Sequence, residues 1–367
     1  MGASSSSPSA SVPKQGKARM FSCHTFLPKS DAVQDVVVDN STIKGGGNPQ
    51  LKMKNKGGKS TKYAFGCICQ GRSEADVQSY YSKDLHPIIQ KTVATNFPDE
   101  QSSVLLLTIG RKGSGKSAVL YGHGGTAETS LSRLICQDLL EMCSGAEQCK
   151  LFVSLIRSDG SKSQVAYDCL AKSDNSSGLL LTSIDNAKAA AEMEIDSLKD
   201  FDKSVLQIGA SAGKAAHTLL VFKVRNEGSG STKQITCKIL DLHGDMPPIT
   251  PAKKDEKSKT GAKSSKGGRG GRKGGRGWSS YDTRNGGSIP SDEDPTNRAI
   301  RRVIDYLARR FHNVPYKDSL FTSLLQSDFE KASILPIVAL VCVGGDGGSG
   351  GDAPVLDFVK KLREIAV

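Results

Sequence analysis

The sequence predicts one α/β domain, in which helices pack on both faces of a central sheet. Apolar runs of strand length alternate with stretches of helical periodicity along almost the whole chain. The apolar run Val104–Ile109 leads directly into the glycine-rich loop Gly110–Ser117. A stretch rich in Lys, Gly, Ser and Arg covers residues 250–294 and shows no periodicity. We therefore expect this stretch to interrupt a single domain at 20–367 rather than divide it.

The N-terminal part is expected to form a disordered Ser-rich tail at residues 1–19, followed by several short strands. Met1-Gly2 with Ser6 also fits the loose N-myristoylation pattern, although a Ser-rich tail produces the same letters. A helix is predicted after the N-cap Ser73, because apolar residues recur at helical spacing up to Val93. The predicted strands are 20–28, 36–38, a segment around Leu51 and Met53, and 63–68.

The rest of the chain continues the alternation. Two of the strands are joined by residues 226–231, whose Gly and Ser content indicates a hairpin. The predicted helices include 131–140, 187–198, 295–310, one beginning at Ser319, and 355–365. The predicted strands are 151–156, 164–170, 218–225, 234–240 and 334–343.

The glycine-rich loop matches the pattern G-x-x-x-x-G-K-[ST] at every fixed position. Glycines allow backbone N–H groups to close around phosphates, and the start of the following helix favours an anion. In this pattern Lys116 neutralises the terminal phosphates and the Ser117 hydroxyl binds Mg²⁺. The sequence therefore predicts a nucleotide site. Its candidate residues are Gly110, Arg111, Lys112, Gly113, Ser114, Gly115, Lys116 and Ser117.

A second apolar strand ends in Asp241, which is followed by Leu242-His243-Gly244. A carboxylate at this place holds the water shell of Mg²⁺, and the backbone N–H of a nearby glycine can face the γ-phosphate. A strand-end Asp can also simply cap a turn. Next to a phosphate-binding loop, the sequence favours a role of Asp241 and Gly244 in the nucleotide site.

The formal net charge is +12, which suggests an acidic partner. Residues 251–276 contain ten Lys or Arg against two acidic residues, so this segment alone contributes +8. Its Arg-Gly-Gly steps resemble RNA-binding tails, and Trp278 and Tyr281 beside it could stack on bases. RNA is therefore one possible partner of this segment.

The nine cysteines are scattered, many of them within apolar runs. Cys67 and Cys69 share one face of a strand, but no second pair completes a zinc site, so free reduced thiols are favoured. No apolar run has the length of a membrane span, and the first residues lack the core of a signal peptide.

Taken together, the order and spacing of these motifs resemble a kinesin motor domain. Asp241-Leu242-His243-Gly244 resembles the family's Asp-Leu-Ala-Gly switch II motif, and Pro315-Tyr316-Lys317-Asp318-Ser319 resembles its Pro-Tyr-Arg-Asp-Ser motif. The similar segments, in chain order, are 63–66, 75–93, 109–122, 241–245, 296–307 and 314–326.

The resemblance implies a P-loop NTPase fold of kinesin-motor type, with a central mixed, mostly eight-stranded sheet and helices on both faces. It also implies ATP and Mg²⁺ as cofactors, microtubules as partner, and a location in the cytoplasm on the cytoskeleton. The basic segment would then follow switch II, on the side that faces the acidic filament. The residues that the resemblance implies for microtubule binding are Arg301, Arg302, Arg309, Arg310, Tyr316 and Lys317.

The sequence departs from the family's pattern in the motifs that carry the ATPase chemistry. Of the switch I motif Ser-Ser-Arg-Ser-His only His217 remains, and Ala215 stands at the position of the Arg. Met246 stands where switch II has its Glu, so both members of that ion pair are missing. On the adenine side, Thr25 and Leu27 replace the two arginines of the family's Arg-x-Arg-Pro motif.

These losses remove groups that position the attacking water, so the ATPase is expected to be slow or inactive. The expected catalytic residues are Asp241, Gly244 and His217, and Lys214 could replace a lost cation. A functional microtubule motor and an RNA-associated P-loop protein are the two alternatives. The sequence shows no heptad repeat that would form a dimeric stalk.

Overall fold

The computed structural model describes fourteen segments of the chain. The predicted tail at 1–19 and residues 250–293 of the predicted insert lie outside them, so these two predictions stay untested. The described residues are 21–27, 36–39, 48–54, 60–96, 102–122, 129–145, 148–158, 161–171, 178–208, 217–226, 233–243, 294–331, 336–344 and 353–365.

A large mixed sheet runs through the described part of the molecule. Its strand order is β5-β1-β13-β6-β12-β11-β7-β8-β9, and β10 pairs with β7. Pairing is parallel from β5 to β12 and antiparallel beyond it. The strands are β1 Phe21–Leu27, β5 Cys67–Gln70, β6 Ser102–Gly110, β7 Cys149–Ser158, β8 Ala166–Asp168, β9 Leu179–Leu181, β10 Met193–Glu194, β11 Thr218–Asn226, β12 Lys233–Asp241 and β13 Ile337–Cys342.

This sheet confirms the predicted fold class, with ten strands where mostly eight were expected. The excess comes from short strands at the β7 side, where β9 and β10 have only three and two residues. A second, three-stranded antiparallel sheet is formed by β2 Val36–Asp39, β3 Gln50–Lys54 and β4 Ser60–Ala64. It contains the hairpin strands predicted around residues 36–38 and 51–53.

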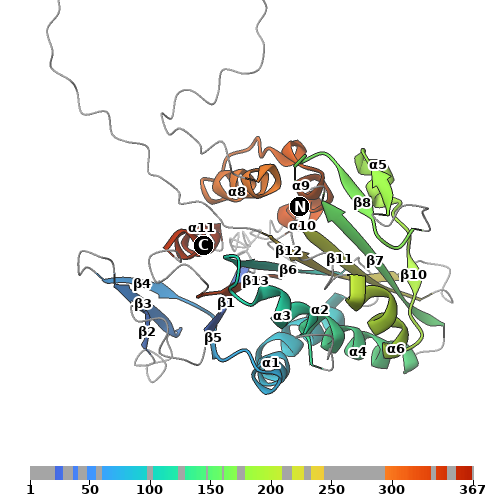
Figure 1. Ribbon diagram of the computed structural model, residues 1–367, viewed down its shortest axis with the longest axis horizontal. Helices are drawn as coiled ribbons and strands as arrows, with labels where there is room; N and C mark the ends of the chain where they lie inside the picture. The colour runs from blue at the N-terminus through green and yellow to red at the C-terminus, as the bar shows by residue number, and fades with distance from the viewer. Residues whose placement is uncertain are drawn as a thin grey trace, which may run out of the picture.

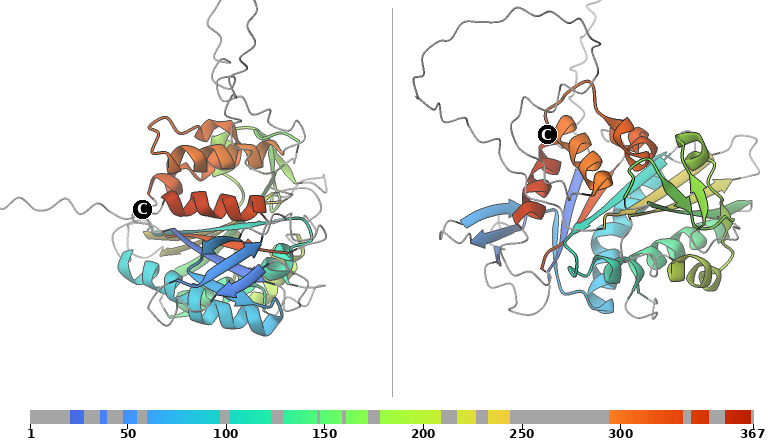
Figure 2. Two further views of the ribbon diagram at one scale, coloured as in Figure 1. Left: turned by 90° about the vertical axis from the view of Figure 1, so that its left-hand side faces the viewer. Right: turned by 45° about the horizontal axis from the view of Figure 1, so that its top comes forward.

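Helices cover both faces of the large sheet (Figure 1). Figure 2 shows α8 and α11, in orange and red, on one side of the sheet, and the blue helices α1 and α2 on the other. The first layer comprises α8 Pro295–Ala308, α9 Leu320–Leu324, α10 Gln326–Glu330 and α11 Ala353–Ile365, with α5 Ile184–Lys188 and the 3₁₀ turn η4 Tyr316–Asp318 nearby. The second comprises α1 Glu74–Tyr80, the π-helical η2 Tyr81–Leu85, α2 His86–Asn96, α3 Lys116–Tyr121, α4 Leu131–Ser144, α6 Leu198–Phe201 and η3 Asp202–Leu206.

The central strand β6 explains why its sequence is apolar without interruption. Leu105 and Leu107 belong to the core on the α8 and α11 side, whereas Val104 and Leu106 belong to the core on the α2 and α4 side. A parallel strand that is covered on both faces loses the polar alternation of a surface strand. The apolar run of this strand was the basis for predicting a strand before the glycine-rich loop.

Local signals explain several helix starts. Ser73 caps α1 and forms a capping box with Asp76, as the sequence predicted for Ser73. Ser319 caps α9 with its hydroxyl, and Asp294 caps α8 ahead of a proline at the first helical position. Among the described residues, no helix is both long and apolar enough to cross a bilayer.

Two predicted elements were wrong. The single strand predicted at 63–68 is divided between the two sheets. β4 ends at Ala64 in the small sheet, and β5 begins at Cys67 in the large sheet. Between them, Gly66 donates its backbone N–H to the Cys23 carbonyl. A Cβ at Gly66 would lie 2.7 Å from the Ser22 hydroxyl, so a residue with a side chain would clash where the chain passes from one sheet to the other. The helix predicted at 187–198 is replaced by α5, β10 and α6. The alanine-rich stretch favours a helix locally, but β10 pairs with β7 instead.

Asp168 holds this irregular region together. Its carboxylate is 1% exposed and accepts backbone N–H groups from Leu170 at 3.1 Å, Ala171 at 3.2 Å and Ala191 at 2.5 Å. The last bond joins the end of β8 to the segment just before β10. A buried carboxylate with several backbone donors replaces secondary-structure bonds that these residues lack.

We predict that Asp168→Ala lowers the free energy of unfolding by about 2–4 kcal/mol, because three backbone N–H groups lose their acceptor. Urea denaturation of the full chain measures the change. Asp185→Ala is the matched control, because Asp185 is exposed on α5 and should change stability by less than about 0.5 kcal/mol. A loss below about 1 kcal/mol for Asp168→Ala would contradict the bridging role.

Candidate nucleotide site

The glycine-rich loop has the backbone conformation that phosphate binding requires. It connects the end of β6 at Gly110 to the start of α3 at Lys116. Gly113 and Gly115 have φ angles of 76° and 79°, in the left-handed region that favours glycine. Gly110 packs against β13, where a Cβ would lie 2.5 Å from the Cys342 carbonyl oxygen. The glycines of the motif are thus required by the loop geometry itself.

Lys116 and Ser114 point inward at this loop. The Lys116 ammonium donates to the carbonyl of Gly110 and, at 3.5 Å, to that of Arg111, and the residue is only 7% exposed. The Ser114 hydroxyl is buried and has no hydrogen-bond partner among the described residues. Ser117 is half-buried at the first turn of α3. A buried cation, an unsatisfied hydroxyl and left-handed glycines fit a phosphate group.

Asp241 lies on the strand next to the loop. β12 pairs in parallel with β6, and Asp241 is opposite Thr108, whose hydroxyl donates to Oδ1 of Asp241 at 2.8 Å. Asp241 is 8% exposed and is the last residue of its strand. The structure therefore brings the predicted metal-shell carboxylate beside the loop. Gly244, predicted with it, lies outside the described residues.

His217 connects three segments. The backbone N–H of His243 donates to Nδ1 of His217 at 3.0 Å, and Nε2 of His217 is 2.7 Å from Oδ1 of Asp294. Because Nδ1 accepts a bond, it carries no proton, and Nε2–H is the donor to Asp294. The imidazole is 1% exposed. Both ring nitrogens are thus used to join the start of β11 to the end of β12 and to the start of α8.

Charge around this site affects two neighbouring groups. Burial lowers the pKa of His243, and the ammonium of Lys116 adds to this shift. Burial by itself raises the pKa of Asp294, but hydrogen bonds from His217 and from the backbone of Asn297 and Thr296 outweigh it, so the pKa is lowered overall. Asp294 is therefore held as a carboxylate, and His243 is held neutral.

Comparison with known proteins identifies the fold, although no family model and no curated protein sequence matches this chain. The superposition on the motor domain of the Kar3-like kinesin from Ashbya gossypii covers 95% of this chain and 99% of that motor domain, with a TM-score of 0.61 and 13% identity. The Drosophila kinesin family member Kin10/NOD, in complex with divalent manganese and ADP, covers 95% and 98%, with a TM-score of 0.60 and 13% identity. Drosophila NOD docked with bovine tubulin into a map of its microtubule complex covers 96% and 99%, with a TM-score of 0.60 and 13% identity.

The chain has the kinesin motor fold. This confirms the resemblance drawn from the motifs and their order, at the level of the fold. The described residues stop at His243, within the segment 241–245 that resembles switch II, and resume at Asp294. Lys214 and Ala215, in the segment predicted to stand in place of switch I, lie outside the described residues, as does Met246.

Three residues near the site were not among the predicted site residues. Asn297 donates its side-chain N–H to the carbonyl of His243 at 2.9 Å, and so links α8 to the end of β12 a second time. Arg72 donates to the carbonyl of Val343, and its side chain lies beside Gly115, where a Cβ would meet its Cδ at 3.0 Å. Asp294 was included in the insert, but it caps α8. Only the N-cap pattern Asp-Pro could have indicated it.

Thr25 and Leu27, which the resemblance places where the family has its two adenine-side arginines, are used for packing. Thr25 is 1% exposed and donates its hydroxyl to the Val341 carbonyl at 3.0 Å, and Leu27 is 6% exposed. The Arg72 side chain lies beside Gly115 of the loop. It comes from the segment before α1, so the structure places a cation near the loop from a different part of the chain.

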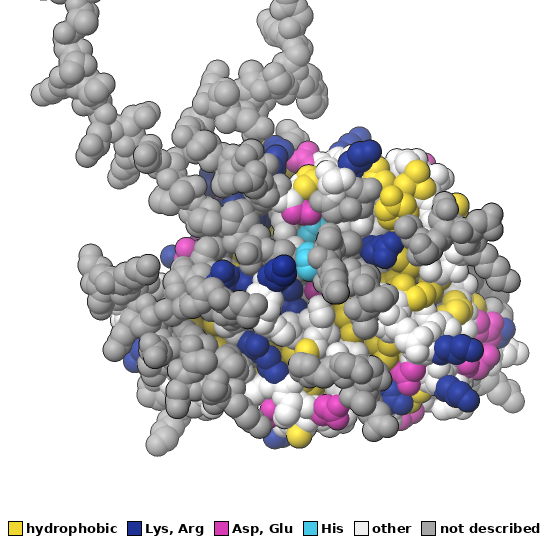
Figure 3. All heavy atoms as spheres, in the orientation of Figure 1, with side chains coloured by type: hydrophobic (Ala, Val, Ile, Leu, Met, Phe, Trp, Pro, Cys, Tyr) yellow, Lys and Arg dark blue, Asp and Glu magenta, His cyan; other side chains and the backbone are white. Residues whose placement is uncertain are grey.

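The residues proposed for microtubule binding lie around α8 and η4. Arg302 forms an ion pair with Asp318 at 2.6 Å, and Arg309 pairs with Asp305 at 3.1 Å. Lys317 is exposed, whereas Tyr316 is 7% exposed and stacks on Phe329. Arg301 is half-buried on α8, and Arg310 is exposed in the turn that follows α8. On the face that Figure 3 shows, Lys and Arg side chains lie in separate groups and form no continuous basic stripe.

Tyr316 therefore needs a correction. Its ring belongs to the core under α9, and its carbonyl accepts the hydroxyls of Thr322 and Ser323. It positions Lys317 without offering a surface of its own. The segment 251–276, with Trp278 and Tyr281, lies outside the described residues, so no observation of the structure bears on RNA.

We predict that Asp294→Ala lowers the free energy of unfolding by about 2–3 kcal/mol at pH 7, because α8 loses its cap and His217 loses an acceptor. Asn at this position keeps an oxygen for both bonds, so Asp294→Asn should lose clearly less. The folded-state pKa of Asp294 lies below its ordinary value of 3.8. The carboxylate contribution is therefore present above that value and is lost as the pH falls through the folded-state pKa.

Urea denaturation at several pH values measures both the loss of stability on substitution and its dependence on pH. The gap between the native chain and Asp294→Ala should be constant from pH 7 to about 5 and should narrow below about pH 4. A gap that widens as the pH falls would show that the carboxylate is not held ionised in the folded state.

Proposed function

We propose that this chain is a kinesin-like domain that binds ATP with Mg²⁺ at the glycine-rich loop and binds microtubules, with weak or absent ATP hydrolysis. The main observation in support is the geometry of the loop. Two glycines in the left-handed conformation, the buried Lys116 and the buried hydroxyl of Ser114 lie beside Asp241, where parallel strands end. Ligands of α/β proteins bind at such strand ends.

Each residue of the loop has a stated role in this proposal. Lys116 exchanges its two loop carbonyls for phosphate oxygens, which are stronger acceptors for an ammonium. Ser117 and, through water, Asp241 would hold Mg²⁺, which would neutralise phosphate charge. Backbone N–H groups of the loop would donate to the phosphates. Arg72 adds a positive charge beside Gly115.

Two structural neighbours support the ligands of the proposal. Kin10/NOD is described with ADP and divalent manganese, and NOD with microtubules. Both have this fold at low sequence identity, so the assignment to this chain rests on its own loop and charges. A cytoplasmic location on the microtubule cytoskeleton follows from the proposal.

The weak hydrolysis rests on the sequence and on His217. The chain lacks the switch I serines and both partners of the switch ion pair. His217 cannot accept a proton at Nδ1 without losing the bond from His243. It is thus a positioning residue between β11, switch II and α8. Loss of one donor that stabilises a transition state typically costs about 10²–10³ in rate, and here several are absent.

We predict that the purified chain binds ATP in the presence of Mg²⁺ but turns it over at less than about 0.1 per second, against a typical enzyme rate of about 10 per second. Microtubules should not raise the rate. Lys116→Ala should weaken ATP binding by roughly a hundredfold, because a charge-assisted bond to phosphate is lost. Lys83→Ala, an exposed position on η2, is the matched control and should bind as the native chain does.

Calorimetry gives the ATP affinity, and a coupled phosphate assay with and without polymerised microtubules gives the rate. Microtubule-stimulated turnover would replace the proposal with a functional motor ATPase. Absence of ATP binding would contradict the proposal that the loop is a nucleotide site. Microtubule-independent binding of RNA would favour the partner suggested by residues 251–276.

Lys317 provides the test of the filament surface. Lys317→Glu should weaken co-sedimentation with microtubules roughly three- to tenfold at low salt, because the filament is acidic. The difference should shrink at high salt, where exposed charges are screened. Lys83→Glu changes the charge by the same amount on the opposite layer of helices. Equal effects of the two variants would show that only net charge matters.

A further inference from the structure

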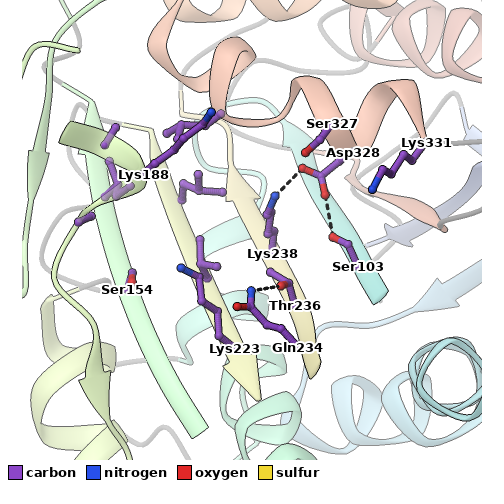
Figure 4. Close-up of a pocket in the computed structure, with 16 residues that line it drawn as sticks. Ser103, Ser154, Lys188, Lys223, Gln234, Thr236, Lys238, Ser327, Asp328 and Lys331 are labelled. Atoms are coloured by element: carbon purple, nitrogen blue, oxygen red, sulfur yellow. Dashed lines mark hydrogen bonds and ion pairs between the residues drawn. The ribbon is translucent and has the colours of Figure 1, made fainter. Parts of the chain in front are cut away.

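A second cavity lies on the α5 and α10 face of the large sheet, and its polar strand residues lie toward the end of the strands away from the nucleotide loop. It has a volume of about 230 Å³ and lies between α5, α10 and the strands β6, β7, β11 and β12 (Figure 4). Ser103 of β6 lines it, and Gly110 lies seven positions further along this extended strand, roughly 23 Å away. The cavity is therefore separate from the nucleotide site.

The strand register shows that polarity is built into this end of the sheet. Residues directly opposite each other on neighbouring strands share a face. Nearest the loop, one row across the four strands is entirely apolar and buried: Leu107, Leu240, Leu219 and Ile156. The next row is mixed: Leu105, Lys238, Val221 and Ser154. The row after that is polar on three strands: Ser103, Thr236 and Lys223.

Polar side chains on central strands cannot reach the sheet edge, so they need polar groups above them. Part of that need is met by Asp328, which is 3% exposed and accepts from Lys238 at 2.6 Å and from Ser103 at 2.7 Å. Lys223 pairs with Glu192, which also pairs with Arg225. The Ser154 side chain is 4% exposed and has no hydrogen bond within the described part of the chain.

Two more lysines stand at the mouth of the cavity from opposite sides. Lys188 comes from the end of α5, and Lys331 directly follows α10 (Figure 4). Neither has an ion-pair partner among the described residues, and both are exposed. The lining therefore contains four lysines and one carboxylate, whose two oxygens are both already bonded. Clefts lined by one sign of charge concentrate the opposite ion.

The lining also defines what kind of anion fits. It contains no aromatic ring on which a base could stack, and its volume is below that of typical drug-sized pockets of about 300–1,000 Å³. Ammonium groups and hydroxyls are donors suited to phosphate oxygens. We propose that this cavity binds a small phosphorylated anion between Lys188 and Lys331, above Ser154 and Thr236, independently of the nucleotide loop.

Pyrophosphate is the probe, titrated into the full chain by calorimetry at low ionic strength. Lys188→Ala with Lys331→Ala should weaken binding at the cavity by at least roughly tenfold, because two charged donors are removed. ATP binding should be unchanged. Lys116→Ala should show the reverse pattern, with the cavity still binding pyrophosphate. The paired control is Lys83→Ala with Lys199→Ala, which removes the same charge from exposed positions on the other layer of helices.

Unchanged melting temperatures without ligand verify that the variants are folded. The proposal is overturned if the Lys188/Lys331 variant binds pyrophosphate like the native chain, if Lys116→Ala removes all pyrophosphate binding, or if the control pair weakens binding as much. Its failure is distinct from failure of the proposed function, which concerns ATP at Lys116 and leaves the cavity unaffected.

Discussion

The parallel pairing of β6 with β12 and β13 is the constraint on which the site depends. Parallel neighbours end at the same edge of a sheet, so Gly110, Asp241 and Val343 meet there. β11 runs antiparallel and starts at that edge, which places Thr218 opposite Asp241 and His217 directly beside it. The pairing is held by apolar side chains such as Leu106 and Leu107, each worth about 1.5–3 kcal/mol when buried. The same residues that build the core thus position the loop.

Features that depend on nearby residues were predictable. The loop motif, its buried strand, the Ser73 cap and the hairpin strands β11 and β12 all follow from patterns spanning a few residues. Partners from distant parts of the chain were not. Asp294 is 77 positions from His217, and no local pattern pairs a histidine with a carboxylate at that separation. Arg72 likewise reaches the loop through the fold alone. The helix prediction at 187–198 failed for the same reason, because pairing with β7 overrode a local preference for helix.

His217 joins two parts of the chain that are far apart in the sequence. Fifty residues, 244–293, separate the described ends at His243 and Asp294. Both ends are bonded to one imidazole, and each hydrogen bond contributes about 0.5–1.5 kcal/mol, with more where a charge takes part. Asn297 adds a third bond, from its side-chain N–H to the carbonyl of His243. These bonds hold the start of α8 against the end of β12.

The distribution of charge determines how the two proposed interactions respond to salt. Of the formal +12, residues 251–276 carry +8, so all the other residues together carry +4. Around α8, Arg302 and Arg309 already have carboxylate partners, which leaves Lys317 as an exposed cation there without an ion pair among the described residues. Attraction to an acidic filament would then come largely from exposed, unpaired charge, which salt screens over about 8 Å under physiological conditions. Lys116 is buried inside its loop, where screening is weak. Binding to a filament and binding to a phosphate thus depend on charges in different environments, and salt separates the two.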